Sequence, residues 1–324
     1  MIIKTKVTEM LGCKYPIIVG TMANITTPEF VAACSNAGAC AVLASANYKT
    51  PDELREAIKK TQSLTNQPFA VNINLFPALM PQDKLEEYVE ATLDEGAKII
   101  ETSGHKAPEH LVPKFKAGGA IWIHKCAGVR YAKKGASLGA DIITVVGYEN
   151  GGATGTLDIG TLVMTPSVVD ALNIPVIAGG GISDGRGVAA VLALGAEGAI
   201  MGTRMMATKE CPIHDNLKQA FVQAAETDTN LVMRSIRNTH RVWRNKAAEK
   251  IIELESKKAS LNEIIQAASG QNALKMYNEG DLDAGMVSCG QGVGLVKDIP
   301  TVKELLDRIM KEAEETIQRL KKIS

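Results

Sequence analysis

Short apolar runs alternate with amphipathic segments along most of this chain. The runs contain few charged residues, as expected of strands that are buried on both faces of a parallel sheet. They lie at residues 15–20, 41–44, 69–75, 98–102, 120–125, 142–147, 176–182 and 199–204. Eight such runs separated by helical patterns predict an α/β protein whose parallel strands close into a (β/α)8 TIM barrel.

Helix signals fill the intervals between these runs. Thr27 precedes Pro28 and Thr50 precedes Pro51, which is the order expected of an N-cap and the first helical residue. Gly38 follows the helix pattern that begins at Pro28. Residues 300–322 form a charged amphipathic pattern that predicts the last helix of the barrel.

One segment departs from the alternation. Residues 212–277 are rich in Lys, Glu, Arg and Asn, and their pattern predicts helix throughout with no strong strand. We therefore expect a barrel domain formed by residues 1–211 and 278–324, with residues 212–277 inserted after the eighth strand as a helical lobe.

Composition narrows the class of protein. Lys plus Arg and Asp plus Glu each number 36, and aromatic residues are 4% of the chain. This balance favours neither nucleic acid nor an anionic membrane surface as a partner. The scattered cysteines form no CxxC pair and the histidines are not at metal-ligand spacing, so no metal is expected. No run approaches the ~20 apolar residues of a membrane span, so we expect a cytoplasmic protein. We also expect its substrate to be a small molecule.

Glycines end the last two apolar runs. Gly179, Gly180 and Gly181 follow one run and Gly202 follows the next, before Thr203. Exposed backbone N–H groups at these positions can bind phosphate, and phosphate sites commonly follow strands seven and eight of such barrels. The alternative is that the glycines only form tight turns.

Two polar side chains lie in otherwise apolar runs. Asn72 needs a hydrogen-bonding partner inside its strand, either a heteroaromatic ligand or the backbone at the strand end. Lys125 ends the fifth run and is expected to point to the barrel mouth, where it can stabilise negative charge. His124 is then expected to point away and to act as a packing residue.

A glycine-rich loop follows the sixth run. Gly151 and Gly152 lie within residues 149–155 and allow the backbone to approach a flat ligand closely. The alternative is a flexible turn.

Several segments resemble the FMN-dependent nitronate monooxygenases, also called 2-nitropropane dioxygenases, including bacterial members that act as NAD(P)H:quinone reductases. The matching segments are residues 20–22, 71–75, 99–102, 123–126, 180–187, 201–204, 209–214 and 233–239. The resemblance extends over nearly the whole chain.

This resemblance implies FMN in the barrel mouth. Met22 would offer its backbone N–H near flavin N5, and Lys125 would favour the anionic reduced flavin. The full set of implied contacts, with those already argued from the residues, is Gly20, Thr21, Met22, Asn72, Lys125, Gly151, Gly152, Gly179, Gly180, Gly181, Met201, Gly202, Thr203 and Gln291.

One position departs from the family pattern. The family usually has Glu-x-Gly-Gly-His-x-Gly after strand six, and its His is the presumed base or substrate anchor, whereas this chain has Ala153. The first motif is also altered, because Thr21 stands where the family commonly has glycine. The catalytic residue is therefore not assigned, and the candidates are Lys125, Thr154 and Tyr148.

These observations leave three functions open. The first is oxidation of alkyl nitronates with O2, with little activity on nitroalkanes because a nitroalkane must first lose a proton to a base. The second is NADH- or NADPH-dependent reduction of quinones or conjugated enoyl thioesters, although no separate dinucleotide fingerprint is present. The third is an FMN-binding protein without catalysis. The sequence does not determine the oligomeric state, and a homodimer is one alternative.

Overall fold

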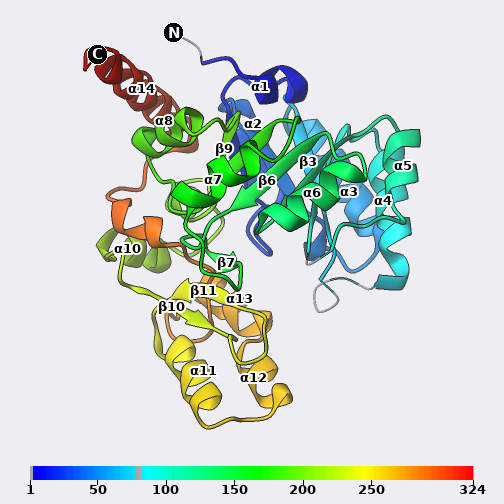
Figure 1. The fold of residues 1–324 in the computed structure, drawn as a ribbon. Helices are drawn as coiled ribbons and strands as arrows, with labels where there is room; N and C mark the ends of the chain where they lie inside the picture. Colours follow the sequence, from blue (N-terminus) through cyan, green and yellow to red (C-terminus); the bar gives the residue numbers. More distant parts are fainter. Residues whose placement is uncertain (1–2, 77–79, 81, 105, 324) are drawn as a thin grey trace.

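A closed parallel barrel forms the body of the protein (Figure 1). The computed structural model describes residues 3–76, 80, 82–104 and 106–323. Within them, the barrel strands are β1 (Ile17–Val19), β2 (Cys40–Ala44), β3 (Phe69–Asn74), β4 (Ile99–Ser103), β5 (Ile121–Cys126), β6 (Ile142–Val146), β8 (Val176–Gly179) and β9 (Gly198–Met201). Parallel pairing of β1 with β9 closes the ring. The predicted eight-stranded TIM barrel is confirmed.

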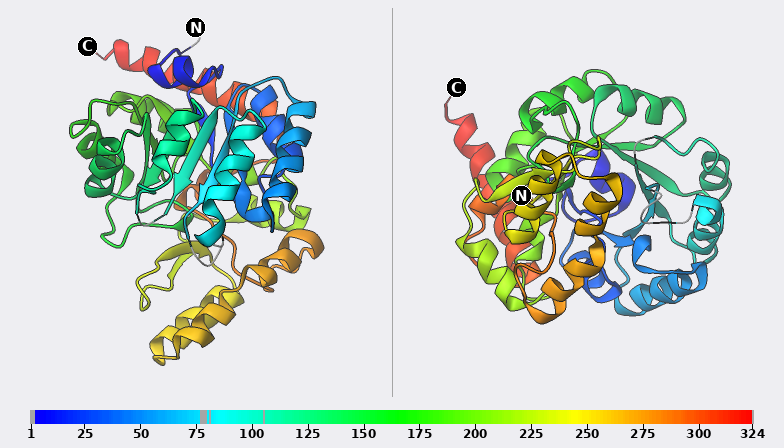
Figure 2. Two further views of the ribbon diagram at one scale, coloured as in Figure 1. Left: turned by 90° about the vertical axis from the view of Figure 1, so that its right-hand side faces the viewer. Right: turned by 90° about the horizontal axis from the view of Figure 1, so that it is seen from below.

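Helices surround the barrel on its outer side (Figure 2). They are α2 (Pro28–Asn36), α3 (Pro51–Leu64), α4 (Leu85–Asp94), α5 (Val112–Ala117), α6 (Val129–Ser137), α7 (Thr161–Val169), α8 (Gly185–Ala193) and α14 (Val302–Lys321). Thr50 caps α3 by accepting the Glu53 N–H, whereas Thr27 lies at the N-cap of α2 without a side-chain cap bond. Short 3-10 helices lie at η1 (Ser45–Asn47), η2 (Gln82–Lys84) and η3 (Gln291–Leu295).

The barrel interior is filled by one apolar residue cluster to which every barrel strand contributes. Its members are Ile18, Cys40, Val42, Ala70, Ile99, Ile123, Ile142, Ile177 and Ile200 from the strands, with Val7, Leu11 and Cys13. Val7 and Leu11 belong to α1 (Lys6–Leu11), which therefore closes the barrel at the N-terminal ends of the strands. The opposite end of the barrel is the mouth.

A smaller lobe lies below the barrel mouth (Figure 1). It contains β10 (Thr229–Val232), β11 (His240–Trp243), α11 (Lys246–Ser256), α12 (Leu261–Ala267) and α13 (Gly270–Glu279). β10, β11 and β7 (Gly152–Ala153) form a separate three-stranded sheet in the order β10-β11-β7. A separate apolar cluster that includes Val232, Val242 and Ile251 packs the lobe.

The expectation of helix throughout residues 212–277 is wrong at these two strands. β10 and β11 pair with each other as a hairpin, and β11 also pairs with a strand of only two residues that comes from the barrel loop after β6. Local periodicity cannot reveal this partner because it lies far away in the sequence. The helix α10 (Asp215–Gln223) contributes Leu217 and Phe221 to the main core.

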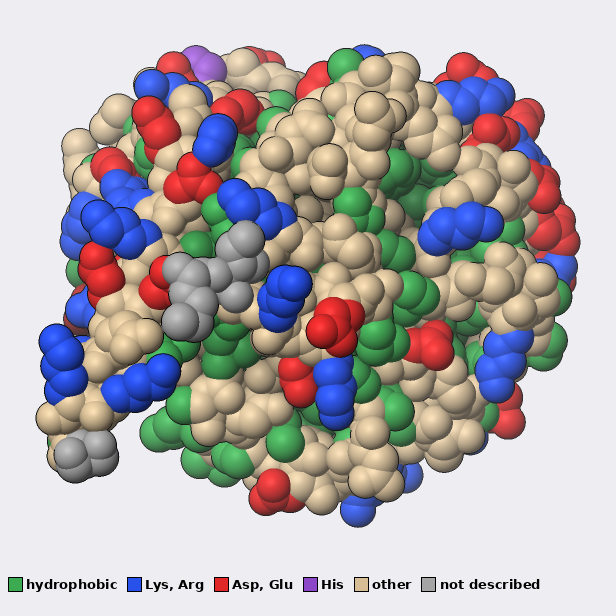
Figure 3. All heavy atoms as spheres, turned by 90° about the horizontal axis from the view of Figure 1, so that it is seen from above, with side chains coloured by type: hydrophobic (Ala, Val, Ile, Leu, Met, Phe, Trp, Pro, Cys, Tyr) green, Lys and Arg blue, Asp and Glu red, His purple; other side chains and the backbone are tan. Residues whose placement is uncertain are grey.

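The outer surface of the barrel carries charges of both signs. Figure 3 shows Lys and Arg side chains interspersed with Asp and Glu over the upper face, consistent with equal numbers in the sequence. In the part of the chain that the structure describes, no helix is both long enough and apolar enough to cross a membrane.

Candidate active site

At the mouth, the layer of inward-pointing residues above the apolar interior consists mainly of polar side chains and glycines. Inward-pointing residues recur every second position along a strand. Two residues beyond the apolar members, β3 to β6 present polar side chains and β1, β8 and β9 reach glycine. The members of this layer are Gly20, Ala44, Asn72, Glu101, Lys125, Thr144, Gly179 and Gly202. The mouth is therefore lined by polar side chains on one side. On the other side, glycines would let a ligand lie close to the backbone.

Glu101 organises the polar side of this layer. Its carboxylate accepts a hydrogen bond from Asn72 Nδ2 at 2.9 Å and lies 3.3 Å from Lys125 Nζ. Asn72 Nδ2 also lies 3.1 Å from Ser103 Oγ. The Glu101 side chain is buried, and Lys125 is partly exposed toward the mouth. The carboxylate therefore orients both the amide and the ammonium group.

Sequence reasoning did not assign this role to Glu101. The signal was available, because Glu101 is an acidic residue two positions beyond Ile99 in an apolar strand. The predicted inward orientation of Asn72 and Lys125 places both beside this carboxylate, as the hydrogen bonds show.

Buried polar atoms without a protein partner lie in the same region. None of the described residues hydrogen-bonds to Asn72 Oδ1 or Thr21 Oγ1, and the same holds for Thr144 Oγ1 in the inward layer. A buried acceptor or hydroxyl is nearly always hydrogen-bonded, by protein, water or ligand. A flavin has donor and acceptor atoms along its ring edge and hydroxyls along its ribityl chain, so these residues fit that group.

The glycines of the last two barrel strands provide the other side of the mouth. A Cβ on Gly179 would lie 2.3 Å from Ile200 Cγ2, so no larger residue fits there without displacing β9. Gly180 and Gly181 have φ values of +105° and +72°, which glycine adopts without strain. Both residues are half-buried and lie in the place where a phosphate was expected.

The N-terminus of α8 is already capped by the protein. Asp184 Oδ1 accepts the Gly187 N–H at 3.0 Å, and Ser183 Oγ donates to Gly292 O at 2.8 Å. The phosphate contacts predicted here would therefore come from the glycine run and not from the first turn of α8.

Loops from distant parts of the chain are joined at this edge of the barrel. The Gln291 N–H donates to Glu149 O at 2.9 Å, and the Gly290 N–H donates to Thr203 Oγ1 at the same distance. Gly151 lies against Cys289 and Gly290, where an added Cβ would lie 2.7 Å from Gly290 N. The segment with Gln291 thus returns to the mouth, next to the loop that follows β6.

Glu149 helps to position the glycine run through contacts with Thr161. Its carboxylate accepts the Thr161 N–H, and Thr161 Oγ1 lies 2.9 Å from both Glu149 Oε2 and Gly180 O. The sequence pattern gave Glu149 no separate function, and the structure gives it this positioning role.

The two methionines of the predicted set are placed differently. The Met22 N–H donates to Thr26 Oγ1 at 3.2 Å, so the donor implied for flavin N5 already has an acceptor in its own turn. Met22 Sδ nevertheless lies close to the mouth, 3.6 Å from a Cβ built on Gly202. Met201 is buried in the outer core, and only its backbone, which accepts the Gly20 N–H at 2.9 Å, faces this region.

Ala153 and the candidate proton donors lie where the barrel meets the small sheet. Ala153 is half-buried in β7, directly opposite His240 of β11. The Tyr148 ring lies under the Arg241 guanidinium, 4.4 Å from its carbon atom, and Tyr148 O accepts a bond from Arg241 Nε. Thr154 Oγ1 is buried with no partner among the described residues.

His124 points away from the mouth, as predicted. Its Nδ1 lies 3.0 Å from Thr102 Oγ1, which also accepts the Trp122 indole N–H. Burial lowers the pKa of His124 to about 4, so the ring is neutral near pH 7. It is a packing residue between β5 and α6.

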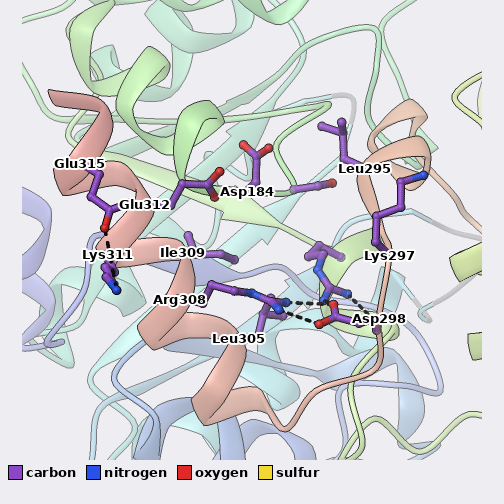
Figure 4. A pocket seen from close by; sticks show the side chains of 12 residues that line it. Asp184, Leu295, Lys297, Asp298, Leu305, Arg308, Ile309, Lys311, Glu312 and Glu315 are labelled. Carbon is purple, nitrogen blue, oxygen red and sulfur yellow. Dashed lines mark hydrogen bonds and ion pairs between the residues drawn. The ribbon is translucent and has the colours of Figure 1, made fainter. Parts of the chain in front are cut away.

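A pocket of about 560 Å³ lies beside the phosphate loop, on the outer side of the barrel (Figure 4). Ser183 and Asp184 line one wall and α14 lines the other. Asp298 binds both Arg204 and Arg308 there, and burial lowers the pKa of Arg204 to about 10. Both arginines of this pocket are therefore used in structural ion pairs at Asp298, separate from the mouth.

The profile of one family covers almost the whole chain: the match to "Nitronate monooxygenase" spans residues 4–312. The chain belongs to the nitronate monooxygenase family. Members of this family are flavin-dependent in general, and the chain is an oxidoreductase. The resemblance stated from the sequence motifs is confirmed.

Relatives from several bacteria resemble this family member over nearly their full length. A (3aS,4S,5R,7aS)-5-hydroxy-7a-methyl-1-oxo-octahydro-1H-indene-4-carboxyl-CoA dehydrogenase of Rhodococcus jostii is 34% identical, with 98% of each chain covered. A probable nitronate monooxygenase of Staphylococcus saprophyticus is 29% identical, with 98% of this chain and 100% of the relative covered.

Solved structures show the same architecture. FabK from Thermotoga maritima superposes with a TM-score of 0.91 at 34% identity, covering 99% of this chain and 100% of the other. A nitroalkane oxidase of Streptomyces ansochromogenes gives a TM-score of 0.84 at 23% identity, covering 97% and 99%, and this likeness supports the fold alone.

Proposed function

We propose that this protein binds FMN in the barrel mouth and oxidises alkyl nitronates with O2. The observation that carries the proposal is the inward layer, in which Asn72, Glu101 and Lys125 face the glycines of β8 and β9. This layer offers hydrogen-bonding groups for a ring on one side and backbone N–H groups for a phosphate on the other.

FMN, when bound, would supply the centre that accepts electrons from the substrate and passes them to O2. The residues of the protein would bind the flavin and stabilise charge on it. Lys125 places a positive charge beside the position proposed for the flavin ring, where negative charge develops on reduction. Glu101 holds the Lys125 ammonium group in position. Asn72 Oδ1 and Thr21 Oγ1, which lack partners among the described residues, provide hydrogen-bonding positions for the ring or the ribityl chain.

A nitronate is a suitable donor for this site because it is already an anion. It needs no base to remove a carbon-bound proton before it gives up electrons. Ala153 cannot accept a proton, so the proposed reaction does not depend on this position. Lys125 also provides the positive charge that would attract an anionic substrate to the mouth.

The test is anaerobic absorbance spectroscopy of the purified protein, followed by oxygen-electrode assays. We expect an oxidised flavin spectrum that bleaches when propyl-2-nitronate is added without O2 and recovers in air with consumption of O2. A protein that retains bound FMN but whose spectrum does not change with the nitronate would contradict the proposal.

A second candidate is NADH- or NADPH-dependent reduction of quinones or conjugated enoyl thioesters. It is supported by the 34% identity over 98% of the chain to a dehydrogenase named for a carboxyl-CoA substrate. Hydride transfer to a flavin depends on positioning more than on a base. Anaerobic mixing with NADH or NADPH would bleach the flavin if this candidate is correct, and an unchanged spectrum with both would exclude it.

The cytoplasm is the compartment we propose for this activity. All six cysteines are free thiols and all are buried, which suits a reducing environment.

A further inference from the structure

A second pocket, of about 350 Å³, lies between α6 and α7. The connection from β5 to α6 forms one wall of it, and the loop that follows β7 forms the other. Its volume falls within the range of small-molecule sites in proteins, which are mostly apolar with a few polar groups. Neither the flavin nor its reaction accounts for this pocket, because its lining includes none of the residues of the inward layer at the mouth.

Apolar side chains make up most of the pocket lining. Met164 is buried and Ile159 is half-buried, whereas Leu157 and Val163 are 78% and 61% exposed at the rim. Tyr131 of α6 extends this rim and is also exposed. Exposed apolar residues are ordinary when scattered, but a group of them around a hollow indicates a surface that binds something.

The charge of the pocket has one sign. Arg130 lines it, and none of the residues that the structure describes forms a hydrogen bond or ion pair with the Arg130 side chain. The described lining residues include no Asp or Glu. Gly128 precedes α6 and gives its first turn no side-chain cap, so the positive end of that helix dipole adds to the charge of Arg130. A ligand with an anionic group would complement this end of the pocket.

Contacts with the rest of the molecule fix the wall formed by residues 154–160. Asp158, whose φ is +53°, forms an ion pair with Arg234 of the lobe at 2.8 Å. This pair occupies the carboxylate that lies next in sequence to the lining residues. The Tyr148 N–H donates to Ile159 O at 2.8 Å and joins the same loop to the end of β6. The pocket is therefore bounded by positioned backbone on this side.

We propose that this pocket binds a single-chain amphiphile with an anionic head group, of which a medium-chain carboxylate is the simplest example. The alkyl chain lies between Leu157 and Val163, and the carboxylate pairs with Arg130. An apolar molecule without charge would leave the arginine unpaired, and a small anion would leave the apolar walls exposed. The proposal concerns a site apart from the mouth, so it does not depend on nitronate oxidation.

The first test is isothermal titration calorimetry with decanoate below its micelle concentration. We expect saturable binding to the wild type. Leu157→Ser should weaken this binding by about tenfold, because the chain loses an apolar contact. Arg130→Gln should weaken it by roughly fivefold, the upper range for an exposed ion pair. The same arginine variant should leave the binding of decanol, which has no charge, unchanged.

Leu162→Ser and Lys133→Gln are the matched controls. Leu162 is 71% exposed beside Val163, and Lys133 is exposed on α6, but neither residue lines the pocket. Both variants should bind decanoate as the wild type does. Equal weakening in a control and in its pocket variant would show that decanoate adsorbs without a specific site, and would overturn the proposal.

A second measurement locates the ligand without relying on affinity. All six native cysteines are buried, so Leu157→Cys introduces an accessible thiol. Decanoate should slow alkylation of this thiol by iodoacetamide and should leave the rate for Leu162→Cys unchanged. A thiol at position 157 that does not react even without decanoate would show that a second copy of the chain covers this face, and would overturn the proposal.

Vesicles of phosphatidylglycerol distinguish a free ligand from a lipid surface. Vesicle binding that is lost in Leu157→Ser, with no saturable binding of decanoate, would overturn the proposal in favour of a membrane contact. Equal affinity of the wild type for decanoate and decanol would overturn the role of the anionic head group. Saturable decanoate binding that depends on both Leu157 and Arg130 is the result we expect.

Discussion

At the scale of single residues, the Lys125–Glu101 pair carries the electrostatics of the mouth. Lys125→Met removes the positive charge but keeps much of the side-chain volume. We expect kcat for a nitronate to fall by about 10²-fold, the order seen when one stabilising donor of a transition state is removed. The measurement is steady-state oxygen consumption with saturating FMN.

A matched control for this change is Lys133→Met on the exposed side of α6. It removes the same charge from the molecule at a distance from the mouth and should leave kcat unchanged. Equal loss of activity in both variants would show that net charge, and not the position of Lys125, determines the rate.

The buried His124 should make the free energy of unfolding depend on pH. Its pKa is lowered from 6.5 to about 4 by burial, so the unfolded chain binds the proton more tightly than the folded protein. The free energy of unfolding should therefore fall as the pH falls from 6.5 to 4, by roughly 3 kcal/mol in total. Urea unfolding at several pH values measures this slope. His124→Gln should reduce it and His110→Gln should not.

At the scale of structural elements, the turn after β8 depends on glycine. A Cβ on Gly180 would lie 2.7 Å from Thr161 Oγ1 and 3.0 Å from Gly147 O, and its φ is +105°. We expect Gly180→Ala to lower the free energy of unfolding by about 1–3 kcal/mol and to weaken FMN binding. Thermal unfolding and flavin fluorescence titration measure the two effects.

Gly270→Ala is the comparison for this substitution. Gly270 opens α13, has no positive φ, and a Cβ built there meets nothing within 4 Å. Its replacement should leave FMN affinity unchanged. A Gly180→Ala protein that binds FMN as tightly as the wild type would remove the glycine run from the proposed phosphate site.

The barrel was predictable from sequence and the small sheet was not. Each barrel strand is a buried and mainly apolar run, and helices alternate with these strands, so local pattern and tertiary position agree. β7 has two residues, Gly152 and Ala153, and becomes a strand only because β11 lies beside it. The same limit applies to the site. Lys125 and Asn72 stand out as polar residues in apolar strands, whereas the role of Glu101 follows from the strand register that places it beside both.

At the scale of the whole molecule, burial protects every thiol. Burial raises the pKa of Cys13 to about 11 and that of Cys126 to about 12. The thiolate is the reactive form, so we expect the native protein to resist a thiol-disulfide reagent at pH 7 and all six cysteines to react in denaturant. Rapid labelling of a native cysteine, detected by mass spectrometry, would contradict this expectation.

The two-residue strand β7 links the barrel and the lobe. It belongs to the loop that leaves the barrel after β6, yet its ladder partners belong to the lobe. Two polypeptide units that look separable along the sequence thus share one hydrogen-bonded sheet. A barrel cut free of residues 212–277 would lose the strands that hold residues 152 and 153 in place. The lobe is therefore a structural component of the mouth, because it supplies the strand beside residues 152 and 153.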